Sequence, residues 1–299
     1  MGKINNVTVF VFWGLSQNPV VEEVCFVVFS FFYAIILLGN LLIMLTVRVG
    51  NLFMFPMYFF LNYLSFVDIC YSSVIIPNMI VDFLAKSKTI SYVGCMSQIF
   101  GLHFFGCTEI FILIVMAYDR YVAICKPLHY MIIMDQNRCN TLLLGAWVGG
   151  FLHSIIQVTL VVQLPFCGPN EIDHYFCDIH PVLKLACTDT YIVGIAMTAN
   201  TGTIVLRSFI VLLISYTVIL VSLRKQSAEG RRKALSTCGS HIAVVVIFFG
   251  PSTFMYMRPD MTFTEDKMVA VFYTIITPML NPLIYTLRNA EVKIAMKKL

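Results

Sequence analysis

The chain alternates long apolar runs with short polar connections. Each run is long enough to cross the hydrocarbon core of a bilayer as a helix, which takes roughly 20 residues. The apolar runs lie at about 24–47, 57–80, 95–118, 140–163, 192–223, 234–257 and 268–287. The pattern therefore predicts seven membrane-spanning helices, with an N-terminal segment 1–23 that contains only a broken apolar run before the first and a tail 288–299 after the last.

Composition supports a membrane protein. Hydrophobic residues make up 59% of the chain and charged residues only 12%, whereas soluble domains carry roughly 25% charged residues. A length of 299 residues leaves no room for a separate soluble domain, so we expect an all-α protein in which residues 1–299 form one seven-transmembrane helix bundle. The net charge of +4 is spread over short loops that would face anionic lipid, and it does not indicate a nucleic-acid partner.

The distribution of basic residues predicts the orientation. Lysine and arginine concentrate in the segments that follow the first, third, fifth and seventh spans, which places those segments in the cytoplasm and the N-terminus outside. Asn6-Val7-Thr8 is a glycosylation acceptor, which has meaning only outside. In the tail, Val292, Met296 and Leu299 recur at helical spacing between lysines, which predicts a short amphipathic helix on the inner membrane surface.

The cysteines divide into two groups. Of ten cysteines, six lie within apolar runs or at their inner ends, and Cys95, Cys167, Cys177 and Cys187 lie on the predicted outer side, where disulfides persist. Their spacing fits no familiar zinc motif. The residues alone leave three pairings open.

Two acids lie inside predicted spans, where ionisable groups are expensive and usually functional. Asp68 and Glu109 fall at similar, middle depths, with Asn40 and Asn281 as amides near them. The group could hold a sodium ion. It could equally be two hydrogen-bonded acids that share one proton, and the residues alone favour neither interpretation.

Polar residues also mark the inner ends of spans. Asp119 and Arg120 end the third span, where an arginine either anchors the helix in the lipid headgroups or meets a partner. In the sequence from Asn281 to Tyr285, Pro282 removes a backbone donor inside the last span, and this predicts a place where the helix can bend.

Five motifs, in order along the whole chain, resemble those of odorant receptors of the rhodopsin-like G-protein-coupled class. They are Pro56–Leu61 with Leu64–Asp68, Met116–Cys125, Ser215-Tyr216, Lys233–Cys238 with Ser240-His241, and Pro278–Tyr285.

The resemblance implies a plasma-membrane receptor, not an enzyme, that binds small volatile molecules and activates the stimulatory olfactory heterotrimeric G protein, raising cyclic AMP. It implies the disulfides Cys95–Cys177 and Cys167–Cys187. It also favours sodium as an ion held by Asp68 and Glu109, with no other cofactor. The activation switch implied by the resemblance comprises Asp119, Arg120, Tyr216, His241, Asn281, Pro282 and Tyr285.

The resemblance further implies a ligand pocket between the third, fifth, sixth and seventh spans. Helical spacing puts Leu102, His103, Gly106, Cys107 and Ile110 on one face of the third. The other spans are expected to contribute Asn200, Thr201, Ile204, Phe249, Thr253, Tyr256, Val271, Thr274 and Ile275. This set suits a small neutral molecule, and Tyr256 is the expected hydrogen-bond donor.

Two residues depart from the family pattern. Phe249 stands where this branch usually has tyrosine, and Arg207 interrupts the middle of the fifth span. Two other functions stay open: a non-olfactory rhodopsin-like receptor, and a small transporter with Asp68, Glu109 and Arg207 along an ion path. A transporter predicts repeated halves with broken helices, and the sequence shows no internal repeat.

Overall fold

The computed structural model describes residues 7–167, 170–224, 228–257 and 263–288. It describes their side chains except at 228–237, 240, 254–257, 263–266 and 286–288. Asn6 and the predicted amphipathic tail helix therefore lie outside the described residues.

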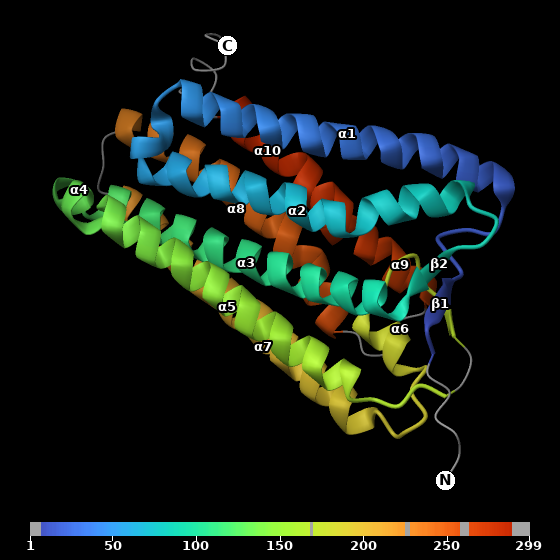
Figure 1. Cartoon of the computed structure of the whole chain (residues 1–299). Coiled ribbons are helices and arrows are strands. Elements are labelled where there is room, and N and C mark those ends of the chain that lie inside the picture. Colours follow the sequence, from blue (N-terminus) through green and yellow to red (C-terminus); the bar gives the residue numbers. More distant parts are fainter. Residues whose placement is uncertain (1–6, 168–169, 225–227, 258–262, 289–299) are drawn as a thin grey trace.

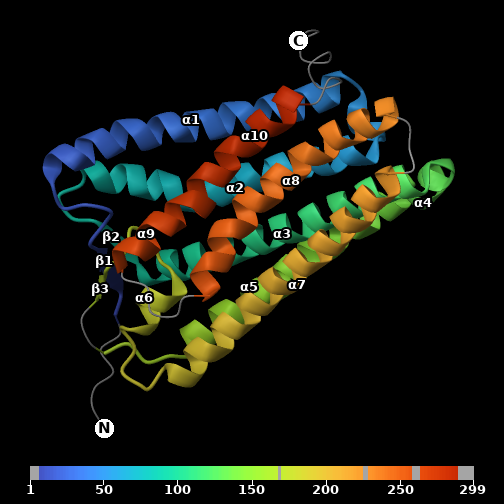
Figure 2. The same cartoon turned by 180° about the vertical axis from the view of Figure 1, so that it is seen from behind.

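Long helices form one bundle, and all seven predicted apolar runs lie within them (Figures 1 and 2). The last span is built from three consecutive pieces, the middle one a π-helical turn. In chain order the helices that build the spans are α1 (Pro19–Val49), α2 (Pro56–Leu84), α3 (Tyr92–Cys125), α5 (Gln136–Val162), α7 (Tyr191–Leu223), α8 (Ala228–Met257), α9 (Phe263–Val271), η3 (Phe272–Ile276) and α10 (Thr277–Arg288).

The bundle suits a bilayer. Within the described residues, six helical stretches are long and apolar enough to cross a membrane, and His241–Thr253 of α8 is a shorter apolar stretch. Large apolar side chains such as Leu38 and Ile192 are about 70% exposed on the outside of the bundle, as expected for positions that lipid covers. The fold is therefore a seven-transmembrane helix bundle.

Side-chain caps set several helix starts. Asn18, Ser91 and Asp135 each accept a hydrogen bond from a backbone N–H in the first turn of α1, α3 and α5. Such caps satisfy donors that a helix start leaves free. The polar connections in the sequence thus determine where the apolar runs become helical.

A small sheet closes one end of the bundle, and we call this the sheet end. Strand β1 (Val9–Phe12) lies between β2 (Thr89–Ser91), to which it is antiparallel, and β3 (Glu171–Ile172), to which it is parallel. The short helix α6 (Ile179–Leu183) follows in the same loop. Strand β1, from the segment before α1, thus pairs with the loop after α5, although the sequence predicts no strand there.

The structure contains both implied disulfides. Cys95 at the start of α3 pairs with Cys177, and Cys167 pairs with Cys187. Gln98 adds a second tie, because its Oε1 accepts from the backbone N–H of Cys177 at 2.8 Å and its Nε2 donates to the Val74 carbonyl at 3.0 Å. The loop is thereby fixed to α2 and α3.

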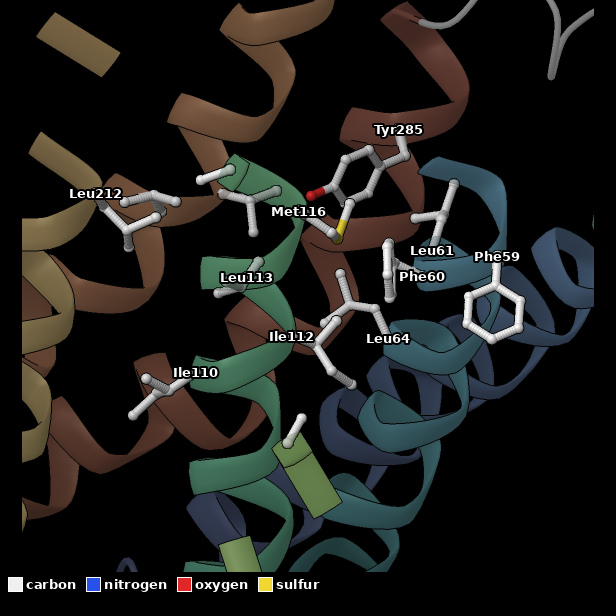
Figure 3. Packing of buried hydrophobic residues seen from close by; sticks show 14 of the residues in the cluster. Phe59, Phe60, Leu61, Leu64, Ile110, Ile112, Leu113, Met116, Leu212 and Tyr285 are labelled. Atoms are coloured by element: carbon white, nitrogen blue, oxygen red, sulfur yellow. The ribbon is translucent and has the colours of Figure 1, made fainter. Parts of the chain in front are cut away.

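The opposite end, which we call the switch end, has short connections. They contain the 3₁₀ turns Leu52–Met54 and Pro127–His129 and the single-turn helix α4 (Tyr130–Ile133). Between the two ends, apolar side chains of α2, α3, α7 and α10 fill the bundle, and Figure 3 shows the ring of Tyr285 beside Met116.

Removal of the Cys95–Cys177 bond should destabilise the sheet end. We expect Cys95→Ala, Cys177→Ala and the double variant to lower the surface level of the protein by the same amount, because either change breaks the same bond, at a cost on the order of 3 kcal/mol. Surface labelling of intact cells measures this. Cys25→Ala is the control, since Cys25 is free and half-buried in α1. Additive losses in the double variant would contradict the prediction.

Candidate functional site

A cavity of about 340 Å³ lies within the bundle toward the sheet end. The predicted face of α3 forms one wall, with Leu102, His103, Gly106, Cys107 and Ile110. On α7, Thr201 and Ile204 line the cavity. Asn200 does not, and its Nδ2 lies 3.5 Å from Nδ1 of His153 on α5.

On α8, the cavity is lined by Phe248 and Ser252 in place of the expected Phe249 and Thr253. Phe249 is fully buried and stacks on Phe209 of α7, with ring centroids 5.9 Å apart. The side chain of Tyr256, the expected donor, lies outside the described residues.

On the last span, Tyr273 lines the cavity, and Val271, Thr274 and Ile275 do not. Thr274 and Ile275 are fully buried. These three residues were expected from the resemblance to the family and not from the helical period of this segment. The π-helical turn Phe272–Ile276 inserts extra residues per turn, so a different side chain faces inward.

The loop after α5 covers the cavity, and the sequence did not predict this. It contributes His174, Asp178, Ile179, His180, Pro181 and Lys184 to the wall. Tyr71 of α2 and His153 of α5 were also missed. The sequence carries one signal that points to the loop, the His-Tyr-Phe run at 174–176, which is too apolar for a solvated connection and is buried.

Lys267 connects this loop to the last span and to the N-terminal segment. Its Nζ donates to Asp173 Oδ1 at 2.6 Å and to the Gly14 carbonyl at 3.0 Å. Burial, together with the positive charge of Lys267, lowers the pKa of His174 to about 3. The imidazole of His174 is therefore neutral in the folded protein.

A second polar site lies deeper, where α2, α3 and α10 meet. Asn281 Nδ2 donates to both carboxylate oxygens of Asp68, at 3.2 and 3.0 Å, and reaches Glu109 Oε1 at 3.5 Å. All three side chains are buried. Asn40 donates instead to the carbonyls of Ile36 and Pro278, so it does not join the two acids.

Glu109 keeps one buried oxygen, Oε2, that has no hydrogen-bond partner among the residues that the structure describes. Carboxylate oxygens are the ligands that hard cations prefer, and an unpartnered buried oxygen is costly. The residues present therefore fit a small cation. Among the described residues, no three His, Cys, Asp or Glu side chains form a metal-binding group, so a cation here would need the Asn281 carbonyl or water as further ligands.

Arg120 is held by its neighbours at the switch end. Its Nε and Nη2 donate to Asp119 Oδ2 at 3.1 and 2.6 Å, and Tyr130 Oη of α4 donates to Asp119 Oδ1 at 2.7 Å. The buried Asp119 carboxylate thus receives three hydrogen bonds and holds the guanidinium to its own helix.

Tyr216 of α7 and His241 of α8 are hydrogen-bonded through Tyr216 Oη and His241 Nδ1. In the described part of the chain, the hydrogen bonds of Arg120 go to Asp119 and not to this pair. Tyr285 of α10 is buried, and its hydroxyl has no hydrogen-bond partner within the described part of the chain. The structure thus brings Asp119, Arg120, Tyr216 and His241 to one end of the bundle as two separate hydrogen-bonded groups, whereas Asn281 belongs to the deeper polar site.

Comparison with known proteins decides the family. The family model described as "Olfactory receptor" matches residues 29–299. The chain belongs to the olfactory receptor family. It is 83% identical to human olfactory receptor 4S2 over 299 residues, which cover 100% of this chain and 96% of that protein.

Other relatives agree. The receptor is 61% identical to human olfactory receptor 4B1, covering 100% of this chain and 97% of the relative. It is 60% identical to mouse olfactory receptor 4B13 over 297 residues, 99% of this chain and 97% of the relative. Family membership makes it a G-protein-coupled receptor of the plasma membrane with multiple spans, and not an enzyme.

The geometry also argues against the transporter alternative. Asp68 and Glu109 lie together in the middle of the bundle, but Arg207 is exposed on the outer surface of α7. The three residues that would have lined an ion path therefore do not face a common interior.

The receptor should lose stability in mild acid because of His174. Its pKa of about 3 in the folded state lies below the unfolded value of about 6.5. Protons therefore bind the unfolded chain preferentially as pH falls below 6.5, and stability decreases. Between about pH 7.5 and about pH 5 this residue should cost about 2 kcal/mol.

The comparison is between the melting temperatures of the detergent-solubilised receptor at the two pH values. His174→Phe keeps a ring against Tyr175 and Phe176, which His174 contacts, and should reduce the acid-induced loss. His129→Phe, at an exposed position at the switch end, should leave it unchanged. An equal loss in the receptor and in His174→Phe would exclude His174 as a cause.

Proposed function

We propose that this receptor binds small, neutral, volatile molecules in the 340 Å³ cavity and then activates the stimulatory olfactory heterotrimeric G protein, which raises cyclic AMP. The observation that carries the proposal is the cavity itself. A loop that is tied to α3 by a disulfide covers the cavity. Helices α3, α7 and α8 line the cavity with residues nearer the sheet end and carry the switch residues at their opposite ends. Family membership supplies the receptor class.

The whole chain 1–299 acts as a single receptor domain in this proposal. Segment 1–23 and the sheet end face outward, and the switch end and tail 288–299 face the cytoplasm. The excess of lysine and arginine in the segments at the switch end supports this orientation. Lipid surrounds the exposed apolar faces, and the odorant enters from outside beside the loop after α5.

Activation is proposed to work through Arg120. While Asp119 and Tyr130 hold its side chain, the guanidinium is not free to meet other partners. A ligand that shifts α8 against α7 would alter the Tyr216–His241 bond and open the space between these helices and α3. Arg120 would then face a cleft into which a G-protein segment fits, and Pro282 and Tyr285 would accommodate the movement of α10.

Sodium is proposed as the ion between Asp68 and Glu109. It would neutralise part of the buried charge and satisfy Glu109 Oε2, which otherwise has no partner. Because the ion binds one packing of α2, α3 and α10, it would stabilise the inactive arrangement. The alternative remains a single proton shared by the two acids.

The function is tested by expressing the receptor in cells with the olfactory G protein and measuring cyclic AMP during a screen of neutral volatiles. We expect concentration-dependent activation, which Arg120→Ala should reduce at least about tenfold, because the guanidinium is the proposed contact to the G protein. Arg48→Ala, at an exposed position at the same end of the bundle, should respond normally. A surface-expressed receptor that answers no volatile would refute the proposal.

Sodium dependence is tested in the same assay with sodium replaced by choline. Removal of sodium should raise basal cyclic AMP by at least about fivefold, the lower end of the usual coupling between two linked binding sites. Glu109→Gln should abolish this effect. Asp82→Asn, at the far end of α2, is the matched control. If the unmodified receptor ignores the exchange of sodium for choline, the shared proton is the better interpretation.

A further inference from the structure

Gln157 of α5 lies behind the cavity wall and is fully buried. Its Nε2 donates to Thr201 Oγ1 at 2.6 Å and lies 3.4 Å from the backbone carbonyl oxygen of Met197. A carbonyl oxygen can only accept hydrogen bonds. The contact with Met197 therefore selects the orientation in which the amide nitrogen faces Met197 and Thr201. In this orientation Gln157 Oε1 is buried and has no hydrogen-bond partner among the described residues. Thr201 consequently accepts a hydrogen bond from Gln157.

The hydrogen of the Thr201 hydroxyl group then needs an acceptor. Helical threonines usually donate to the carbonyl one turn earlier, as Thr108 does to Phe104 and Thr217 to Leu213, both at 2.7 Å. For Thr201 that carbonyl belongs to Met197, which Gln157 already approaches. Among the described residues nothing accepts the Thr201 hydrogen. Because Thr201 lines the cavity, this hydrogen is available to a ligand.

The other walls carry further polar side chains, namely Tyr71, Cys107, His153, His174, Ser252 and Tyr273. Of these, Ser252 Oγ already donates to the Phe248 carbonyl at 2.9 Å. Opposite, on α3, His103 Nε2 is buried and has no hydrogen-bond partner among the described side chains, and the centroid of the His103 ring lies 5.4 Å from that of His153. Thr198 Oγ1 faces His180 at 3.3 Å, nearer the loop. The apolar lining of the deep part comprises Leu102, Ile110, Ile204, Val205 and Phe248. The deep cavity thus presents a fixed donor from Thr201 in apolar surroundings.

We propose that Gln157 is a positioning residue that fixes Thr201 as a hydrogen-bond donor, and that the receptor therefore prefers neutral carbonyl compounds, namely small ketones and aldehydes, over hydrocarbons of the same shape. This inference rests on the proposed function. A carbonyl oxygen only accepts, so it matches a hydroxyl whose own acceptor role is already filled. The volume of about 340 Å³ lies at the lower end of ligand pockets, roughly 300–1,000 Å³, which restricts the ligand to a small molecule.

The test uses three shape-matched probes: methyl hexyl ketone, the secondary alcohol formed by its reduction, and the alkene in which a methylene group replaces the carbonyl oxygen. The ketone should be the most potent and the alkene the least. Thr201→Val removes the donor and should weaken the ketone about 3- to 10-fold relative to the alkene, the worth of one hydrogen bond. Thr201→Ser should keep the ketone preference.

Gln157→Met is the decisive variant, because Gln157 lies behind Thr201. It leaves the Met197 carbonyl free, so Thr201 turns to it and the donor is lost from the cavity. The ketone should lose potency as in Thr201→Val, the alkene should not, and the double variant should show no further loss. The alcohol, which can donate as well as accept, should lose less. Thr203→Val and Gln163→Met change exposed residues of the same two segments and should leave all potencies unchanged.

Three results separate this inference from the proposed function. If Gln157→Met shifts all three probes equally at normal surface level, Gln157 is only structural and the inference is wrong, although the receptor function stands. The inference also fails if other volatiles activate the receptor but the alkene matches or exceeds the ketone. If no volatile activates the unmodified receptor, the proposed function itself fails.

Discussion

The hydrogen bonds of Asn281 to Asp68 and Glu109 are the interaction on which the bundle depends. Lipid offers no hydrogen bonds, so polar groups at this depth must be satisfied within the protein. One amide nitrogen, from α10, serves acids from α2 and α3. The last span is thereby fixed against the first half of the chain. Next to Asn281, Pro282 packs against Gly39 of α1, where an added Cβ would lie 3.0 Å from the proline ring. A change in this site must move α10.

Polar side chains are also satisfied within the protein at two other depths along α3. Near the sheet end, Gln98 ties the covering loop to α2. At the switch end, Asp119 collects Arg120 and Tyr130. Helix α3 therefore carries a polar contact at each depth, to the loop, to α10 and to α4. A ligand beside His103, as proposed, would act on the helix that makes all of these contacts, and this gives the small cavity a physical route to the opposite end of the bundle.

The parts of the structure that follow from local patterns could be predicted from the sequence. Apolar length gave the spans, and helical spacing gave the α3 wall, because both depend on one segment at a time. The errors lie where the helix departs from the regular α-helical period or where two segments interact. A sequence pattern does not reveal the π-helical turn that brings Tyr273 inward, nor the stacking on Phe209 that turns Phe249 away from the cavity. A local sequence pattern also does not reveal strand β1, because its partner strands lie about 80 and 160 residues later in the chain.

Phe249 also bears on how a ligand would reach the switch. A tyrosine there, usual in this branch, would offer a hydroxyl beneath the cavity, and this receptor has none. Instead Phe248, which lines the cavity, meets Phe249 edge-on at 5.2 Å, and Phe249 stacks on Phe209 of α7. Close-packed rings move as a unit, so a ligand pressing on Phe248 would shift α8 relative to α7. These two helices share the Tyr216–His241 bond nearer the switch end, and aromatic packing can therefore take the place of a polar link.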